Sequence, residues 1–261
     1  MTKVIVPVDF SETSLNAAKY ANAFLAGHHG VTIILYHSYS KSSEAAEASA
    51  KLEDLKTFLF SVHPVIIEIL LHEEPDFVEG LERAARHKKA DLVIMGITGK
   101  SEMAQAFFGS NTLKMAETKA CPVLIVPESA SFTTMKNVML TSDFKDTLHT
   151  TPSEPIKQFL KIYNSKLHVV NVDKDHYISL TDKYEMEKQD LKKLLGDFNP
   201  EFYFMRIFDI DEAIELFSQD YFIDLIIVVQ RNRSFMDKLF KTSRTKKLSF
   251  HSKLPILVIH E

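Results

Sequence analysis

Two segments of the chain, one in each half, align with each other without a gap. They are Asp91–Glu128 and Asp224–Glu261. Each begins with Asp-Leu and an apolar run of strand type, and each ends in a proline followed by a second apolar run. The beginnings of the halves also match, because KVIVPVDFS resembles NVMLTSDFK and places Asp9 opposite Asp143. The sequence therefore predicts one unit of about 130 residues used twice.

This repeat sets the predicted domain boundaries. We expect a first domain at residues 1–128, a linker at 129–135 and a second domain at 136–261. The linker sequence, SASFTTM, is small and polar, as linkers commonly are. With 261 residues, of which 45% are hydrophobic and 25% charged, the chain can bury two cores and is not biased toward disorder.

Each half alternates short apolar runs with helical patterns. We expect strands at 4–8, 32–36, 65–71, 92–95 and 123–126, and again at 138–141, 167–171, 202–207, 225–229 and 256–259. Helical patterns separate them, including one that begins near Pro75 and one at about 154–163. The alternation predicts an α/β chain with two tandem doubly wound parallel five-stranded sheets. In such sheets, ligands bind beyond the C-terminal strand ends, where the strand order reverses.

Three glycines and a serine follow the strand predicted at 92–95. Gly96 and Gly99 interrupt the apolar run, and Gly109-Ser110 open a helical pattern that extends to about residue 119. Glycine lets the main chain approach a ligand closely, and a helix start offers unpaired N–H donors that suit phosphate. We favour an anion-binding loop over glycines that merely turn the chain. The spacing is neither that of a P-loop nor that of a dinucleotide fold.

Asp9 stands at the C-terminal end of the first predicted strand. Its carboxylate could accept hydrogen bonds from a ligand's hydroxyl or amino groups. Alternatively, it could cap the following helix through the amides of Ser11 or Glu12. We favour the ligand because of the glycine loop.

The pattern Gly96-x2-Gly99-x9-Gly109-Ser110, together with VPVDFSETS around Asp9, resembles the ATP-binding branch of the universal stress protein family. The resemblance covers both halves, so the whole chain is similar to a tandem member. It implies an α/β sandwich that holds ATP at the strand switch point, often with a divalent metal such as Mg²⁺. It also implies dimerisation through the last strand.

The resemblance assigns roles in the first half. Asp9 would bind the adenosine end, and Ser38 falls where main-chain groups meet adenine. Gly96 and Gly99 would pass close to ribose and phosphates. The remaining expected contacts are Pro7 and Val8 lining the pocket, and Gly109, Ser110 and Asn111 holding the phosphates.

The second half departs from this pattern. Opposite Gly96, Gly99, Gly109 and Ser110 stand Val229, Asn232, Thr242 and Ser243. A Cβ at each of these glycine positions should block the triphosphate, so we expect ATP in the first domain only. The same segment is basic, and we favour a solvated face over a site for an anion or an acidic partner. Its basic residues are Arg231, Arg233, Lys238, Lys241, Arg244, Lys246, Lys247 and Lys253.

These observations favour a nucleotide-dependent regulatory protein of the stress response. Phosphoryl transfer needs positioned catalytic groups, and the pattern supplies no evident general base or arginine finger, so binding is favoured over turnover. Two alternatives stay open. One is a slow ATP-hydrolysing or nucleotide-activating enzyme of the same superfamily, and the other is a protein-interaction module without a small ligand.

Composition narrows the expected partners and compartment. No apolar run is long enough to span a bilayer, and a net charge of −4 gives no general attraction to nucleic acid or anionic membrane. The single Cys121 permits no internal disulfide, which fits the cytoplasm. The final strands, at 123–126 and 256–259, would be exposed edges, so we expect them to pair within the chain. A further homodimer stays open.

Overall fold

The computed structural model describes residues 1–97, 110–171, 182–205, 210–231 and 254–261. The chain divides into two compact units, Met1–Thr133 and Thr134–Glu261. Each unit has its own buried core, built mainly from the apolar strand residues that alternate with helices in the sequence. The two units are therefore described separately.

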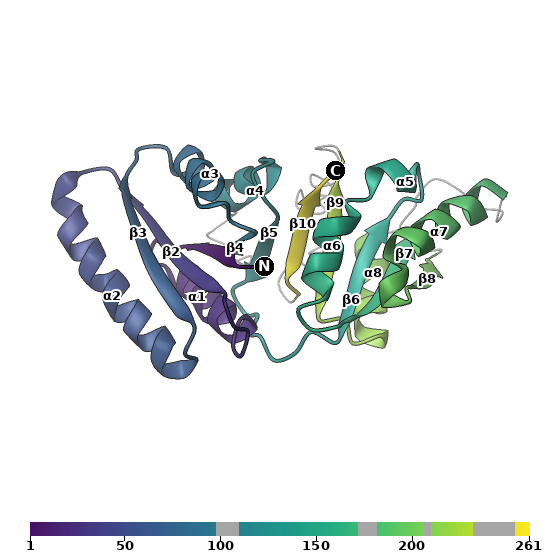
Figure 1. Ribbon diagram of the computed structural model, residues 1–261, viewed down its shortest axis with the longest axis horizontal. Coiled ribbons are helices and arrows are strands. Elements are labelled where there is room, and N and C mark those ends of the chain that lie inside the picture. Colours follow the sequence, from purple (N-terminus) through teal and green to yellow (C-terminus); the bar gives the residue numbers. More distant parts are fainter. Residues whose placement is uncertain (98–109, 172–181, 206–209, 232–253) are drawn as a thin grey trace. The chain divides into compact units, whose positions relative to one another are not determined.

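The first unit contains a parallel sheet in the order β3-β2-β1-β4-β5 (Figure 1). Its strands are β1 (Lys3–Pro7), β2 (Thr32–Tyr39), β3 (Ile66–Glu73), β4 (Leu92–Ile97) and β5 (Val123–Pro127). Its helical segments are α1 (Glu12–Phe24), η1 (Ser42–Glu44), α2 (Ala45–Val62), α3 (Phe77–Lys88) and α4 (Ser110–Glu117). Because β1 lies between β2 and β4, the strand order reverses beside the end of β1.

Apolar side chains on both faces of the strands explain this layering. Val4, Ile5 and Val6 are fully buried although successive strand residues point to opposite faces. A sheet that is apolar on both faces needs helices on both sides. Accordingly, α1 contacts α2, whereas α3 contacts α4. The predicted doubly wound α/β fold is confirmed.

Side-chain caps set two helix starts in this unit. Ser11 caps α1 by accepting from the Ser14 amide. Asp76 caps α3 by accepting from the amides of Val78 and Glu79. The prediction that Pro75 occupies the first turn of this helix is therefore wrong by two residues.

The second unit repeats the strand order as β8-β7-β6-β9-β10, again all parallel. Its strands are β6 (Asn137–Ser142), β7 (Lys166–Asn171), β8 (Glu201–Phe204), β9 (Leu225–Gln230) and β10 (Ile256–His260). Its helical segments are α5 (Thr147–Thr150), α6 (Ser153–Leu160), α7 (Asp182–Leu195), η2 (Gly196–Phe198) and α8 (Ile210–Asp220).

Equivalent hydrogen bonds are found inside each unit at matching positions. The Asp91 carboxylate accepts from the amides of Thr2 and Lys3, and the Asp224 carboxylate accepts from those of Lys136 and Asn137. Phe10 and Phe144, which follow the aspartates after the first strand of each unit, both have positive φ, at 63° and 52°. Non-glycine residues rarely adopt this conformation, so its recurrence supports the repeat found in the sequence.

The helix after the first strand differs between the units. In the first unit, α1 is continuous over 13 residues. In the second unit, the corresponding segment is divided into the four-residue α5 and the eight-residue α6, with Thr151 and Pro152 between them. Proline lacks an amide hydrogen, so it favours a helix break at this point. The sequence pattern predicted a single helix here and missed α5.

Candidate functional site

A pocket of about 520 Å³ lies at the C-terminal edge of the first unit's sheet. Its volume is in the range of small-molecule sites. Among the described lining residues, Asp9 and Glu74 are charged, and none is Lys, Arg or His. The described lining consists of Pro7, Asp9, Ser11, Thr13, Ser14, Ser38, Ser40, Glu74, Pro75, Phe77, Met95, Gly96, Asn111 and Thr112.

The structure brings several predicted site residues into this one pocket. They are Pro7, Asp9, Ser38, Gly96 and Asn111, which come from four different parts of the unit. Val8 is buried beside them, but it is not part of the described lining. Gly99 and Gly109 lie outside the described residues. Ser110 is the first residue of α4, and its side chain is likewise not described.

Asp9 is held by the turn that follows β1. Its Oδ1 accepts from the Ser11 amide at 3.0 Å and from the Ser11 hydroxyl at 2.5 Å. Partial burial raises the pKa of this carboxyl, but the hydrogen bonds from Ser11 and Ser14 outweigh that effect and lower it overall. Asp9 is therefore a carboxylate at neutral pH. The Ser11 amide contact expected from the capping alternative is present, although Ser11 itself is the helix cap.

Gly96 has a packing role that the sequence analysis missed. It lies within β4, so the prediction that it ends the strand and enters a loop is wrong. A Cβ at this position would overlap the Thr13 carbonyl oxygen and lie 2.8 Å from the Thr13 carbonyl carbon. The Gly96 carbonyl also accepts from the buried Thr112 hydroxyl at 2.9 Å. The absence of a side chain thus lets α1 approach β4, while Thr112 ties α4 to the same strand.

Val8 and His37 shape the adjoining strand ends. The Val8 amide donates to the Tyr36 carbonyl at 2.8 Å. His37 Nδ1 lies 2.6 Å from the Val8 carbonyl oxygen, and because a carbonyl can only accept, Nδ1 carries the proton. This contact holds the His37 ring against the main chain that follows β1.

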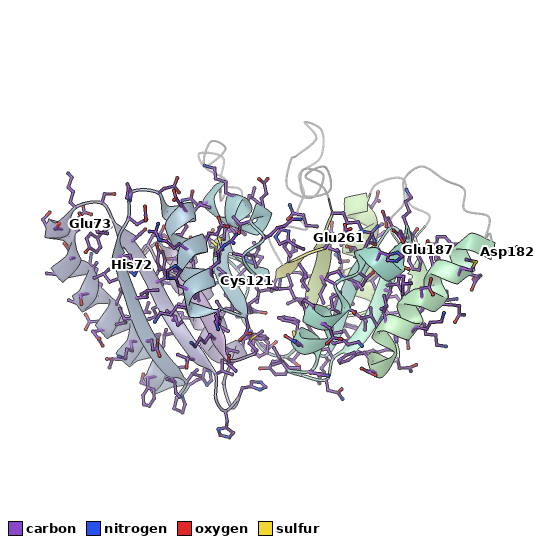
Figure 2. The ribbon with its side chains drawn as sticks, turned by 45° about the horizontal axis from the view of Figure 1, so that its top comes forward. His72, Glu73, Cys121, Asp182, Glu187 and Glu261 are labelled. Atoms are coloured by element: carbon purple, nitrogen blue, oxygen red, sulfur yellow. The ribbon has the colours of Figure 1, made fainter. Side chains whose placement is uncertain are left out.

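The described residues offer neither a reactive cysteine nor a cluster of metal ligands. Burial raises the pKa of Cys121 to about 12, so it is a poor nucleophile at neutral pH (Figure 2). Within the described ranges, no group of three or more His, Cys, Asp or Glu side chains is arranged to hold a metal ion. None of the helices in these ranges combines the length and apolarity needed to cross a membrane.

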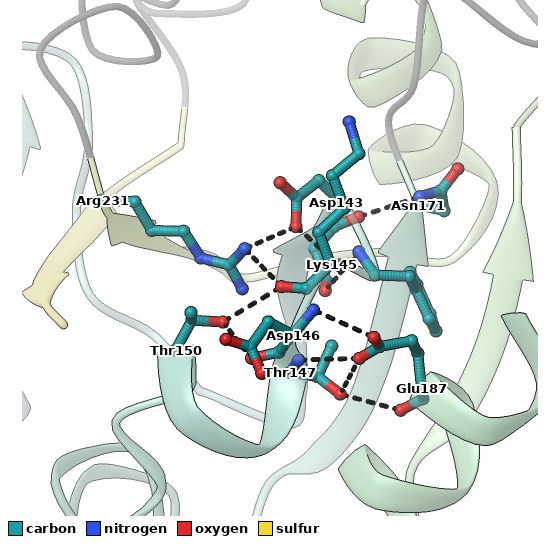
Figure 3. A network of polar contacts seen from close by, with 10 residues as sticks. Asp143, Lys145, Asp146, Thr147, Thr150, Asn171, Glu187 and Arg231 are labelled. Carbon is teal, nitrogen blue, oxygen red and sulfur yellow. Dashed lines mark hydrogen bonds and ion pairs between the residues drawn. The ribbon is translucent and has the colours of Figure 1, made fainter. Parts of the chain in front are cut away.

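In the second unit, an arginine occupies the space beside the matching aspartate. Arg231 donates to Asp143 Oδ1 at 2.8 Å and to the Lys145 carbonyl at 2.7 Å (Figure 3). The carboxylate that corresponds to Asp9 is therefore neutralised by the chain itself. Arg231 was predicted from the sequence to lie on a basic face, but its ion pair with Asp143 was not predicted. The other members of that face, residues 233–253, lie outside the described part of the chain.

The carboxylate of Glu187 belongs to the same network of polar contacts. Glu187 of α7 accepts from the Asp146 amide at 3.0 Å, the Thr147 amide at 2.7 Å and the Thr147 hydroxyl at 2.8 Å (Figure 3). A carboxylate thus occupies the positive end of α5. Burial raises the pKa of Glu187, but the hydrogen bonds from Thr147 and Asp146 lower it overall. No local sequence signal indicated this contact, because the two partners are far apart in the chain.

Comparison with known proteins agrees with the fold. Residues 1–127 match the universal stress protein family. A universal stress protein of Methanocaldococcus jannaschii is 29% identical over 48% of this chain and 81% of its own length. Another, from Thermus aquaticus, is 29% identical over 47% of this chain and 96% of its own length.

A solved structure resembles the whole chain in fold. It is a universal stress protein from Archaeoglobus fulgidus, with a TM-score of 0.67 and 15% sequence identity. The match covers 99% of this chain and 98% of that protein. At this identity, the similarity shows a shared fold.

Proposed function

We propose that this chain is a tandem universal stress protein whose first unit binds an adenine nucleotide, ATP in particular, and whose second unit does not. One observation carries the proposal. Pro7, Asp9, Ser38, Gly96 and Asn111 were selected from the sequence, and all of them border one pocket at the strand switch point. The universal stress protein match to residues 1–127 covers this same unit.

The chemistry of the pocket suits a nucleoside phosphate. Asp9 is ionised and can accept hydrogen bonds from ribose hydroxyl groups. Asn111 lies in the first turn of α4, where unpaired amide donors and the helix dipole favour phosphate. A helix start at one end of the pocket and a carboxylate beside β1 thus provide complementary contacts for the two parts of the ligand. Mg²⁺ could accompany the phosphates as a ligand-borne ion.

In the second unit, internal groups take the place of a ligand. The Arg231 guanidinium holds Asp143, and Glu187 holds the α5 amides. A nucleotide held in the way proposed for Asp9 would have to displace Arg231 from Asp143. We therefore propose that this unit is a nucleotide-free partner of the first, paired with it through the final strands in a cytoplasmic protein that binds rather than turns over ATP.

Calorimetric titration of ATP into variants of Asp9 and Asp143 tests this assignment. We expect isothermal titration calorimetry with ATP and Mg²⁺ to give one site per chain, because Arg231 already engages the matching carboxylate of the second unit. At ATP concentrations 100 times Kd, binding should add about 2.7 kcal/mol to stability and raise Tm by several degrees. Asp9→Ala should weaken binding at least about 10-fold, since it removes a charge-assisted hydrogen-bond acceptor.

Asp143→Ala is the matched control, because it removes the corresponding carboxylate of the second unit. It should leave the ATP affinity and the stoichiometry unchanged. Two sites per chain, or equal losses in both variants, would contradict the assignment of the nucleotide to the first unit.

A further inference from the structure

The end of the first unit's pocket that lies beside β3 carries a second carboxylate, in addition to Asp9. In the strand order β3-β2-β1-β4, the end of β3 and the start of α4 lie on opposite sides of β1. Glu74 follows β3 and lines the pocket together with Pro75 and Phe77. Its neighbour Glu73, at the end of β3, is exposed and does not belong to the described lining (Figure 2).

Several contacts fix the position of Glu74. The Arg83 guanidinium donates to its Oε2, and the Asp76 amide donates to its Oε1 at 3.3 Å. The Glu74 amide donates to the Tyr39 carbonyl at 3.0 Å. Only 11% of the Glu74 side chain is exposed, compared with 46% of Arg83. A carboxylate has about four acceptor positions, so it can still receive hydrogen bonds from a ligand.

Gly80 of α3 makes room for this arrangement. A Cβ at Gly80 would lie 2.5 Å from Glu74 Cγ and 2.6 Å from the Tyr36 hydroxyl. Glycine inside a helix costs roughly 0.5–1 kcal/mol relative to alanine, so its presence here indicates a packing requirement. The helix approaches the end of β2 closely because this position has no side chain.

The Tyr36 hydroxyl adds a buried polar group to the same place. Tyr36 is fully buried, and its hydroxyl makes no hydrogen bond of normal geometry to another described residue. Burial raises the pKa of Tyr36, with Ser38 and Glu74 as its polar neighbours. Its ring lies 6.2 Å from that of Phe77, measured between centroids. At the pocket itself, Pro75 and Phe77 supply apolar walls and Glu74 supplies a polar edge.

We propose that Glu74 is the specificity-determining residue for the nucleobase and accepts an N–H from its exocyclic amino group. The inference rests on the proposed nucleotide binding and adds to it the end of the pocket that holds the base. Phosphates are repelled by Glu74 and favoured at the start of α4, so the base lies toward β3. A base has flat apolar faces and a polar edge, which match Phe77 and Pro75 on one hand and Glu74 on the other.

Two ligands that differ only in the amino group test the proposal. ATP carries the group, and purine riboside 5′-triphosphate lacks it. We expect calorimetry on the full wild-type chain to show ATP binding about 10-fold or more tightly, because a hydrogen bond to a charged acceptor is lost. In Glu74→Met the two affinities should become equal.

Arg83→Met is the matched control, because it breaks the same ion pair but keeps the carboxylate. It should retain a clear preference for ATP, and circular dichroism should show that both variants are folded. Equal wild-type affinities for the two ligands, or an unchanged preference in Glu74→Met, would overturn the role of Glu74 alone. Failure of the wild type to bind either triphosphate would instead overturn the proposed function and this inference with it.

Discussion

Gly96→Ala is expected to lower the free energy of unfolding of the first unit by about 3 kcal/mol, which is a large effect for the addition of one methyl group. The added Cβ would meet the main chain of Thr13 rather than the flexible end of a side chain. Relief would require α1 to move away from β4. That movement would also disturb the pocket, since Thr13 and Gly96 both line it.

Denaturant unfolding followed by circular dichroism measures the loss of stability. Hydrogen exchange of β4 and α1 amides locates it in the first unit. Gly196→Ala is a suitable control, because a Cβ there would meet nothing within 4 Å and its φ is not in the positive region. The control should change stability by no more than about 0.5 kcal/mol. If Gly96→Ala were equally mild, the close approach of α1 to β4 would not be required.

The second large effect is expected for Glu187→Ala, which should lower the free energy of unfolding of the second unit by about 2 kcal/mol. The substitution removes the acceptor of the Asp146 amide and of the Thr147 amide and hydroxyl. Thr147 is fully buried, so its donors would be left without water as a replacement. Glu185→Ala is the control on the same helix, since the ion pair between Glu185 and Lys188 lies at the surface. Hydrogen exchange of α5 distinguishes the two outcomes, and equal protection in both variants would contradict the role of Glu187.

The same carboxylate predicts a pH dependence. The folded-state pKa of Glu187 lies below its ordinary value of 4.5, so its contribution to stability is present above that value. The contribution is lost as the pH falls through 4.5 toward the lower folded-state pKa. Glu187→Gln should therefore reduce the acid sensitivity of the second unit, measured by α5 hydrogen exchange between neutral pH and about pH 4. A variant as acid-sensitive as the wild type would show that other groups cause the loss.

Most of the architecture could be predicted from local patterns. Apolar runs such as 4–8 and 225–229 alternate with helical segments, and the structure confirms parallel doubly wound sheets. Some helix boundaries differ from the prediction because they depend on side chains that form hydrogen bonds with main-chain amides. Asp76 accepts from two amides and caps α3 after Pro75, and the short α5, which was not predicted, precedes Pro152 and the helix predicted near 154–163.

Only part of the candidate site could be predicted, because some of its residues follow from strand-end positions and others from long-range contacts. Residues at the carboxyl ends of parallel strands meet at one edge, so Asp9 and Gly96 could be placed together from the sequence, whereas Ser38 was added by the family resemblance. Glu74 was not among the site residues predicted from the sequence, because its neighbours Tyr36 and Gly80 come from other elements. Thr112 was missed for the same reason, since its contact with Gly96 spans a segment of the chain that no local rule connects.

Local sequence patterns were enough to predict a repeated unit and the alternation of strands and helices, and to show that the second half lacks the glycines at the matching positions. These features depend on residue types at short spacing, where conformational preference is local. Only the tertiary structure decided that Gly96 faces the Thr13 main chain, that Arg231 neutralises Asp143 and that Glu187 holds the start of α5. Such contacts join residues distant in the chain, and their energies exist only once the backbone has brought charged and apolar groups within reach.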